Sequence, residues 1–239
     1  MTRHSPSHFR QPSHSLTPQR PEAPVPEPPK PQAPKAPRRR IGIYGGTFDP
    51  IHYGHLLLAE SARLQMRLDE VLFVPAGIPP HKRDWVLAPD EHRLAMLELA
   101  IAENPFFRIE RFEINKPSVS YTVETVEYLQ AKNPDAELFL LLGEDMLRIF
   151  PQWRNPERIC ELAPPLVIGR AGRQIRDLSF LEAIASPRRM RQIRRSRIHM
   201  IQVAYSSSEL RDCVAAGKSI RYQTPPEVIA YIQKHQLYR

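Results

Sequence analysis

The chain has 239 residues and a formal charge of +8, from 34 basic and 26 acidic residues. No run approaches the ~18 apolar residues that span a bilayer, which excludes a membrane-spanning protein, and two cysteines are too few for a disulfide scaffold. Cys160 and Cys213 also lack the spacing of a metal site, so we expect buried thiols in a reducing cytoplasm. The basic charge fits a nucleic acid, an acidic membrane surface or a polyphosphate ligand about equally well.

Residues 1–38 differ in composition from the rest of the chain. They hold eleven of the 26 prolines, many Ser, Gln and His residues, and almost no aliphatic ones. Such a segment buries too little apolar surface to offset the entropy lost on ordering. We therefore predict a disordered proline-rich tail at 1–38 and a single domain at 39–239, with no signal peptide at the N-terminus. The PxxP spacings in the tail leave a docking role open.

The rest of the chain alternates between predicted strands and predicted helices. Short apolar runs predict strands at Ile41–Tyr44, Glu70–Pro75, Phe106–Ile109, Leu138–Leu142, Leu166–Ile168 and Ile198–Val203. Helical spacing predicts helices with apolar faces at Leu57, Leu64 and Leu68, at Leu94, Leu97 and Ile101, and at Thr122, Val126 and Leu129, with two more helices after the last strand. The alternation predicts an α/β protein with a doubly wound parallel sheet and right-handed crossovers.

The string GGTFDPIHYGH at 45–55 carries the most chemical information. It lies between the first predicted strand and the first predicted helix, so its glycines and histidines fall on a strand-to-helix turn. Helix N–H groups lack partners at such a turn and point at a ligand above the strand ends. Gly45 and Gly46 allow a phosphate to approach closely, and His52 and His55 both reach it. The string therefore predicts a site for the phosphates of a nucleotide.

A second string, AYSSSELR at 204–211, has the features of an anion-binding helix start. Ser206 and Glu209 have capping-box spacing, so local chemistry alone predicts that a helix begins here. Hydroxyls, free N–H groups and the positive end of the helix dipole would converge on an anion. Arg211, one turn into the helix, adds a fork of donors for phosphate oxygens. Taken alone, a plain cap with a surface arginine explains this string equally well.

The most basic part of the chain is 170–197, which includes the arginine clusters at 188–191 and 194–197. A face that binds a polyanion is one interpretation, and a solvated helix or variable insertion is the other. We favour the second, because no aromatic residues are interleaved with these arginines for base stacking. Nucleic acid is therefore not the expected partner.

The two strings together resemble the signatures of the HxGH nucleotidyltransferase superfamily, which pairs a (T/H)xGH motif with an I-S-S-T-x-x-R element. Here Tyr205 stands for the aliphatic residue and Ser208 for the threonine. The chain looks most similar to the bacterial nicotinate-nucleotide adenylyltransferase family, and the resemblance covers nearly all of residues 41–239. Further similar stretches are Pro79–Lys82, Ser120–Thr122, Gly143–Leu147, Phe150, Trp153, Pro225, Val228 and Tyr231–Ile232. The family's usual Arg-Pro-Gly is Arg170-Ala171-Gly172 here.

The resemblance implies a Rossmann-like nucleotidyltransferase fold and two groups of binding residues. The ATP group is Gly45, Gly46, Thr47, Phe48, His52, His55, Asp145, Ser206, Ser207, Ser208 and Arg211. Within it, His52, His55 and Arg211 would be catalytic, and Asp145 would bind the adenosine ribose. The mononucleotide group is Lys82 for the phosphate, Trp153 for stacking on the nicotinate ring, and Tyr121 with Thr122, where backbone N–H groups would receive its carboxylate.

The resemblance also implies a reaction: AMP passes from ATP to nicotinate mononucleotide, giving deamido-NAD and pyrophosphate in NAD biosynthesis. The attacking phosphate is already anionic, so catalysis needs alignment and charge stabilisation rather than a side-chain nucleophile. Mg²⁺ is expected to arrive on the ATP phosphates, with no metal site in the protein. Nicotinamide mononucleotide and phosphopantetheine stay open as alternative acceptors, and a nucleic-acid-binding protein using Arg188–Arg197 is a less favoured alternative. The sequence also leaves open whether the chain forms a homo-oligomer.

Overall fold

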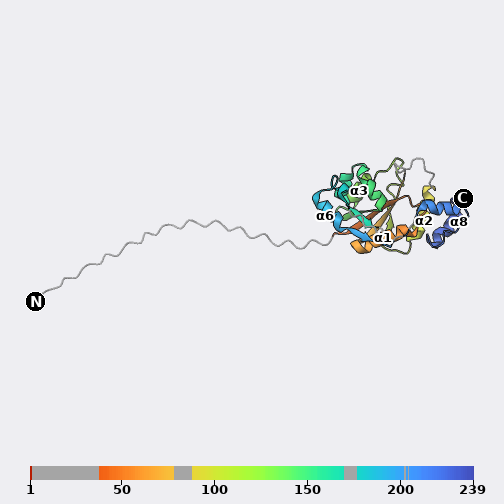
Figure 1. Ribbon diagram of the computed structural model, residues 1–239, viewed down its shortest axis with the longest axis horizontal. Coiled ribbons are helices and arrows are strands. Elements are labelled where there is room, and N and C mark those ends of the chain that lie inside the picture. Colours follow the sequence, from red (N-terminus) through yellow and green to blue (C-terminus); the bar gives the residue numbers. More distant parts are fainter. Residues whose placement is uncertain (2–37, 78–87, 170–176, 202, 204) are drawn as a thin grey trace. The chain divides into compact units, whose positions relative to one another are not determined.

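The computed structural model describes residues 1, 38–77, 88–169, 177–201, 203 and 205–239. All described helices and strands lie in one compact unit, Pro37–Arg239 (Figure 1). Within these ranges, no helix has the length and apolar character that crossing a membrane requires. The predicted loop containing Lys82, the segment at 170–176 and most of the proline-rich tail fall outside the described residues.

Six parallel strands form a single sheet in the order β3-β2-β1-β4-β5-β6. The strands are β1 (Arg40–Gly46), β2 (Glu70–Pro75), β3 (Phe107–Ile109), β4 (Glu137–Leu142), β5 (Pro165–Gly169) and β6 (Arg197–His199). In the centre of the sheet, β4 is buried from Leu138 to Leu142, as its continuous apolar run predicts for a strand covered on both faces. The predicted doubly wound parallel sheet is confirmed.

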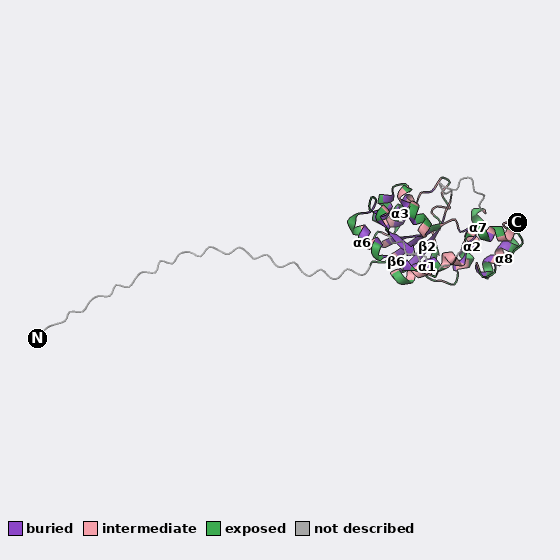
Figure 2. Ribbon diagram, viewed as in Figure 1, coloured by how far each residue is buried: buried purple, intermediate pink, exposed green. Residues whose placement is uncertain are grey.

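Helices cover both faces of this sheet, and Figure 2 shows the buried strands between them. One face packs against α1 (Tyr53–Met66), α2 (Asp90–Ile101), α7 (Ser207–Ala215) and α8 (Pro226–Lys234). The other packs against α3 (Thr122–Lys132), α4 (Glu144–Ile149), α5 (Pro156–Leu162) and α6 (Pro187–Arg195). Alternate residues of a strand point to opposite faces, so Leu138 and Leu140 join one core while Phe139 and Leu141 join the other.

The predicted apolar face of the first helix is wrong. Leu57 is 38% exposed and Leu64 60% exposed, and Leu68 lies beyond the end of α1. The helix instead buries Leu58, Ala59 and Ala62. Leucines seven residues apart do lie on one side of a helix, but here the small alanines allow closer packing on the sheet, so the opposite side faces inward.

The last predicted strand is also shorter than its apolar run. β6 ends at His199 rather than Val203, because it has a single neighbour, β5, and pairs with it as far as Gly169, where β5 ends. The short helices α4 and α5 were not predicted as separate elements, and α6 lies in the basic region, for which a solvated helix was one part of the favoured interpretation. The two helices expected after the last strand are α7 and α8.

Candidate active site

A cavity of about 510 Å³ opens where β1 and β4 end. β1 pairs with β2 on one side and β4 on the other, so the connections leave this point in opposite directions. Ligands of open α/β sheets bind at such a switch point, beyond the carboxyl ends of the strands. Ten of the eleven residues of the predicted ATP group line the cavity: Gly45, Gly46, Thr47, His52, His55, Asp145, Ser206, Ser207, Ser208 and Arg211.

Phe48 is the member of this group that does not line the cavity. Its side chain is 1% exposed and packs edge-on against His55, with ring centroids 5.2 Å apart, and against Tyr44 and Phe73. Its φ of 49° lies in the left-handed region, which is uncommon for a bulky residue. The Phe48 side chain therefore supports His55 from the core and does not reach a ligand in the cavity.

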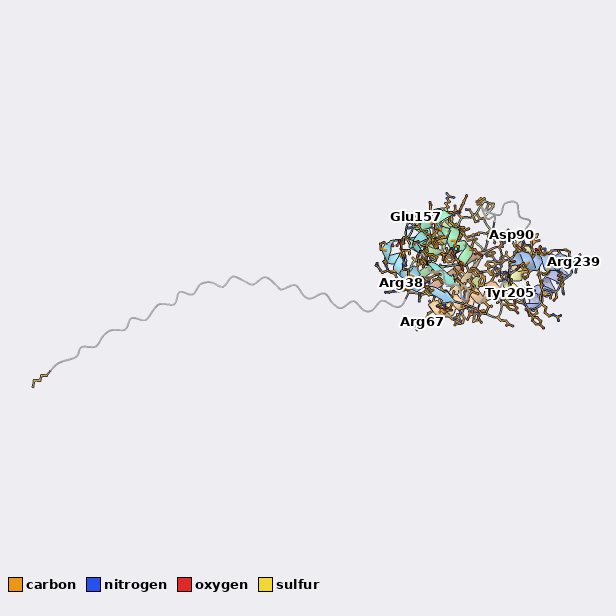
Figure 3. The ribbon with its side chains drawn as sticks, viewed as in Figure 1. Arg38, Arg67, Asp90, Glu157, Tyr205 and Arg239 are labelled. Atoms are coloured by element: carbon orange, nitrogen blue, oxygen red, sulfur yellow. The ribbon has the colours of Figure 1, made fainter. Side chains whose placement is uncertain are left out.

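His52 and His55 form a stacked pair where α1 begins, with ring centroids 3.7 Å apart and 21° between their planes. The backbone N–H of His52 donates to Nδ1 of His55 at 3.2 Å, which places the proton of a neutral His55 ring on Nε2. A Cβ at Gly54 would lie 3.0 Å from two atoms of the His52 ring. Glycine at 54 therefore leaves room for the His52 imidazole. The ring of Tyr205, labelled in Figure 3, lies edge-on to His52 at 6.4 Å.

Burial favours the neutral form of both imidazoles by lowering their pKa values. It lowers the pKa of His52 to about 4. It also holds the pKa of His55 well below its usual range, and the neighbouring His52 lowers that pKa further. Nδ1 of His52 is buried and has no hydrogen-bond partner among the described residues. Each neutral ring carries one N–H, so the pair can donate to an anion without carrying a buried charge when the cavity is empty.

The serine-rich start of α7 forms another part of the cavity wall. Ser206 caps the helix, because its Oγ accepts from the backbone N–H of Glu209 at 3.2 Å and donates to Oε2 of Glu209 at 2.8 Å. The predicted helix start is confirmed. Ser207 has a different role: its Oγ donates to the carbonyl of Pro50 at 2.9 Å. This bond fastens α7 to the β1–α1 loop, while the first N–H groups of the helix have no partner within it.

Arg211 joins the same two parts of the wall. Its Nη1 donates to the carbonyl of Asp49 at 2.7 Å, and its Nη2 donates to Oγ of Ser208 at 3.2 Å. The side chain is 23% exposed and lines the cavity. The guanidinium is thus held at both ends by the protein and still presents part of its surface to the cavity.

The structure adds Arg93, a residue that supports the cavity wall and that the sequence patterns did not single out. It is fully buried on α2; its Nη1 donates to the carbonyl of Thr47 at 2.9 Å and its Nη2 to the carbonyl of Ala76 at 2.8 Å. Arg93 therefore ties the loop after β1 to the end of β2. In the sequence, Arg93 stands directly before Leu94 of the predicted apolar face. A charge at that position is the feature that could have indicated its role, because a buried charge needs polar partners.

Two further residues near the C-terminus bond to the β1–α1 loop. Oγ1 of Thr224 donates to the carbonyl of Ile51 at 2.6 Å. The hydroxyl of Tyr238 donates to Oδ1 of Asp49 at 2.6 Å. Nothing in the sequence marks either residue, because their partners lie more than 170 positions away along the chain.

The described residues of the predicted mononucleotide group do not line the cavity. Thr122 is the first residue of α3, and Tyr121 precedes it. Trp153 packs edge-on against Phe150 at 5.3 Å, and its Nε1 is buried with no partner among the described residues. The guanidinium of Arg154 lies 4.5 Å above the Tyr121 ring, so Tyr121 and the Trp153 segment are neighbours. Lys82 lies outside the described residues.

The basic region is a helix where the structure describes it. α6 buries Met190 and Ile193 against the sheet. Arg189 pairs with Glu161 at 3.6 Å, and Arg194 pairs with Glu182. Arg170 lies outside the described residues. Among the described residues as a whole, no group of three or more His, Cys, Asp and Glu side chains is placed to hold a metal ion.

Comparison with known proteins connects this geometry to a family. The cytidylyltransferase-like family profile matches residues 43–212. A probable nicotinate-nucleotide adenylyltransferase from Roseiflexus sp. (strain RS-1) is 48% identical over 201 residues, covering 83% of this chain and 98% of the relative. The protein of the same name from Thermomicrobium roseum is 46% identical over 200 residues, covering 84% and 92%.

A solved structure shares the fold. The Plasmodium falciparum nicotinic acid mononucleotide adenylyltransferase complexed with NaAD superposes with a TM-score of 0.65 at 23% identity. The match covers 84% of this chain and 98% of the other. The chain therefore belongs to the cytidylyltransferase-like family and, within it, to the nicotinate-nucleotide adenylyltransferases.

Proposed function

We propose that this enzyme transfers AMP from ATP to nicotinate mononucleotide in NAD biosynthesis. An oxygen of the mononucleotide phosphate attacks the α-phosphorus of ATP and forms a new P–O–P linkage. The bond between the α-phosphorus and the bridging oxygen breaks, and its electron pair leaves with pyrophosphate. Because the attacking oxygen is already anionic, the protein has to align two anions and stabilise the charge that develops on the leaving group.

The observation that carries this proposal is the stacked pair His52 and His55 at the start of α1, inside the cavity. Two neutral imidazoles there supply N–H donors, and the positive end of the helix dipole adds to their attraction for phosphate. Arg211 supplies a permanent positive charge on the same wall. We assign these three residues to the ATP phosphates in the transition state.

The remaining cavity residues complete the ATP site in this proposal. Gly45, Gly46 and Thr47 bring backbone close to the phosphates, and Ser206, Ser207 and Ser208 present the start of α7 to them. Ser207 does so through its backbone, because its hydroxyl is bonded to Pro50. Asp145 would accept hydrogen bonds from the two adjacent ribose hydroxyls.

The acceptor would bind on the side of the unit where Trp153 and Tyr121 lie. Trp153 would stack on the nicotinate ring, N–H groups near Tyr121 and Thr122 would receive its carboxylate, and Lys82 would hold its phosphate. The unpartnered Nε1 of Trp153 supports a ligand at this place, because a buried indole N–H without a hydrogen bond is costly.

We propose that Mg²⁺ enters as part of the ATP substrate, bound to its phosphate oxygens. The carboxylates at the cavity wall are Glu144 and Asp145, and Glu144 pairs with Arg148 at 2.8 Å. This donor set fits a metal held mainly by phosphates, since Mg²⁺ keeps several waters and seldom uses an all-protein cage.

An acceptor assay tests the function. The full-length enzyme is given MgATP with nicotinate mononucleotide, nicotinamide mononucleotide or phosphopantetheine, and pyrophosphate release and the nucleotide product are measured. We expect kcat/KM for nicotinate mononucleotide to exceed that for the amide by at least about tenfold, because carboxylate donors left without their partner reject the amide. A preference for phosphopantetheine refutes the proposal.

The same assay includes His55→Ala, which removes a donor to the developing charge and lowers kcat by about 10²–10³. His199→Ala is the matched control, because His199 is exposed on β6 and does not line the cavity. Near-wild-type turnover by folded His55→Ala contradicts the assignment of the histidine pair.

A further inference from the structure

A buried carboxylate, Asp49, does not line the cavity, but it contacts Arg211, which does. Its side chain is 0% exposed and belongs to the β1–α1 loop. Oδ2 accepts from the backbone N–H of Ala88 at 3.3 Å and lies 3.9 Å from Nη1 of Arg211. A carboxylate removed from water requires several such partners. Asp49 thus links the loop to α7 and to the residue that follows the segment containing Lys82.

The remaining partner of this carboxylate comes from the far end of the chain. The Tyr238 hydroxyl donates to Oδ1 of Asp49 at 2.6 Å and lies 3.9 Å from the sulfur of Met96 on α2. Burial, and then the Asp49 carboxylate, raise the pKa of Tyr238, so its hydroxyl keeps its proton. Tyr238 follows α8, which packs on α2; Figure 3 labels Asp90, where α2 begins, and Arg239, the neighbour of Tyr238.

We propose that Tyr238 is a positioning residue for adenylyl transfer: its hydrogen bond fixes the Asp49 carboxylate, and Asp49 in turn fixes Arg211 at the cavity wall. The inference deepens the proposed function and rests on it for the role of Arg211. Tyr238 itself does not line the cavity.

The contacts of Asp49 explain how loss of the Tyr238 hydroxyl would change the position of Arg211. Arg211 bonds to the carbonyl of Asp49 at 2.7 Å but stays 3.9 Å from its carboxylate, just beyond hydrogen-bond distance. With the Tyr238 hydroxyl in place, one carboxylate oxygen is engaged and the guanidinium is left available to the cavity. Arg211 faces Oδ2, whereas Tyr238 holds Oδ1. Without that hydroxyl, the carboxylate is free to rotate and to turn towards the guanidinium of Arg211, a charged donor 3.9 Å away. A full Asp49–Arg211 ion pair would withdraw the guanidinium from the ATP phosphates.

Tyr238→Phe tests the inference, because it deletes the hydroxyl and keeps the ring. We expect kcat/KM for ATP to fall by about tenfold, the scale of one lost hydrogen bond to a charged group. Tyr222→Phe is the matched control: Tyr222 is 80% exposed and, like Tyr238, has a positive φ, 67° against 62°. The control should stay within about twofold of wild type, as surface substitutions generally do.

A double-mutant cycle separates positioning from a general structural effect. In an Arg211→Ala background, Tyr238→Phe should change kcat/KM for ATP by less than about twofold, because the residue it acts through is gone. If Tyr238→Phe costs the same factor with and without Arg211, the two act independently and the proposal is overturned. It is also overturned if folded Tyr238→Phe keeps wild-type kcat/KM.

Asp49→Asn supplies a second route if Tyr238→Phe does not fold. It keeps an oxygen acceptor for the Tyr238 hydroxyl but removes the charge beside Arg211, and its loss in kcat/KM should also vanish in the Arg211→Ala background. An additive loss overturns the proposal. Wild-type enzyme is assayed in parallel, so that failure to adenylate nicotinate mononucleotide, which would refute the proposed function, is distinguished from failure of this inference.

Discussion

Two imidazole rings packed 3.7 Å apart constitute a site that is neutral when empty and favours an anion when filled. Like charges this close disfavour each other, so the pair does not ionise in the buried, unliganded state. A phosphate brought against the rings supplies the opposite charge and raises both pKa values. In the empty cavity His52 and His55 therefore add no charge to that of Arg211, the permanent cation on the same wall.

This neutrality predicts how acid affects stability. The pKa of folded His52 is about 4, against 6.5 for the ordinary side chain, so the unfolded chain binds a proton that the folded protein refuses. The contribution of neutral His52 is fully present above pH 6.5 and is lost as the pH falls from 6.5 towards 4, by up to roughly 3 kcal/mol. Urea unfolding at pH 7 and pH 4.5 measures this loss.

His52→Gln is the comparison for that experiment, because glutamine does not titrate and all other groups are shared. The variant should lose less stability than the wild type between the two pH values. Equal losses in the two proteins would mean that His52 is not held neutral by the fold.

At the residue scale, the sequence predicted the chemistry of the cavity wall better than the support beneath it. Gly45, His52, His55 and Arg211 were predicted because each has a residue type suited to phosphate at a local spacing, and all four line the cavity. Phe48 was assigned to the same group, but its left-handed φ turns the ring into the core. No short-range pattern encodes that turn, so it could not be predicted.

At the scale of elements, the glycines near the ends of strands β1 and β2 have different surroundings. A Cβ on Gly45 would meet nothing within 4 Å and would project into the cavity. A Cβ on Gly77, two residues after β2, would lie 2.3 Å from the carbonyl oxygen of Glu113. The first position is kept open for a ligand, while the second allows two backbones to pass closely.

Alanine substitutions should therefore separate activity from stability. Gly45→Ala should leave the unfolding free energy within about 1 kcal/mol of wild type but raise KM for ATP, because the new methyl group occupies cavity space. Gly77→Ala should lower the unfolding free energy by about 1–3 kcal/mol through overpacking against backbone. Denaturant unfolding and ATP-dependent kinetics on both variants check the contrast, and a stability loss in Gly45→Ala would contradict it.

Strands were predicted more accurately than helix faces, for a physical reason. A central strand is buried on both faces, so the apolar run Leu138–Leu142 predicts β4 without any need to decide which side chains face the core. A helix has an inner and an outer side. In α1, Leu57 and Leu64 lie outside while Leu58, Ala59 and Ala62 lie inside, because the two small residues allow close packing on the sheet. On α2, the fully buried Arg93 occupies a place that periodicity reserves for an apolar residue.

At the scale of the molecule, the compact unit Pro37–Arg239 contains every described contact of the cavity. We expect a variant lacking residues 2–36 to fold, with Tm within a few degrees of the full chain, because the proline-rich sequence of the deleted segment has almost no aliphatic residues to contribute to a core. Its kcat for adenylyl transfer should stay within about twofold of wild type. Calorimetry and the acceptor assay measure both, and a large loss of kcat would assign the N-terminal segment a part in catalysis.

The topology of the whole unit could be predicted from its β-α-β order, because the handedness of parallel crossovers leaves few arrangements. The contacts that join residues near the C-terminus to the β1–α1 loop could not be predicted from the sequence. Thr224 to Ile51 and Tyr238 to Asp49 join residues separated by 173 and 189 positions, and neither pair has a distinctive spacing. Such contacts follow from the final packing of α8 on α2, which sequence periodicity does not encode.

The bond between Asp49 and Tyr238 also has a consequence for the order of events on the ribosome. Asp49 is translated 189 residues before the tyrosine that completes its hydrogen bonds, and Ile51 waits almost as long for Thr224. A nascent chain therefore carries both histidines long before the β1–α1 loop is secured by these two hydrogen bonds. Chains terminated before Tyr238 would lack this hydrogen bond, so we expect them to transfer AMP more slowly than the full chain.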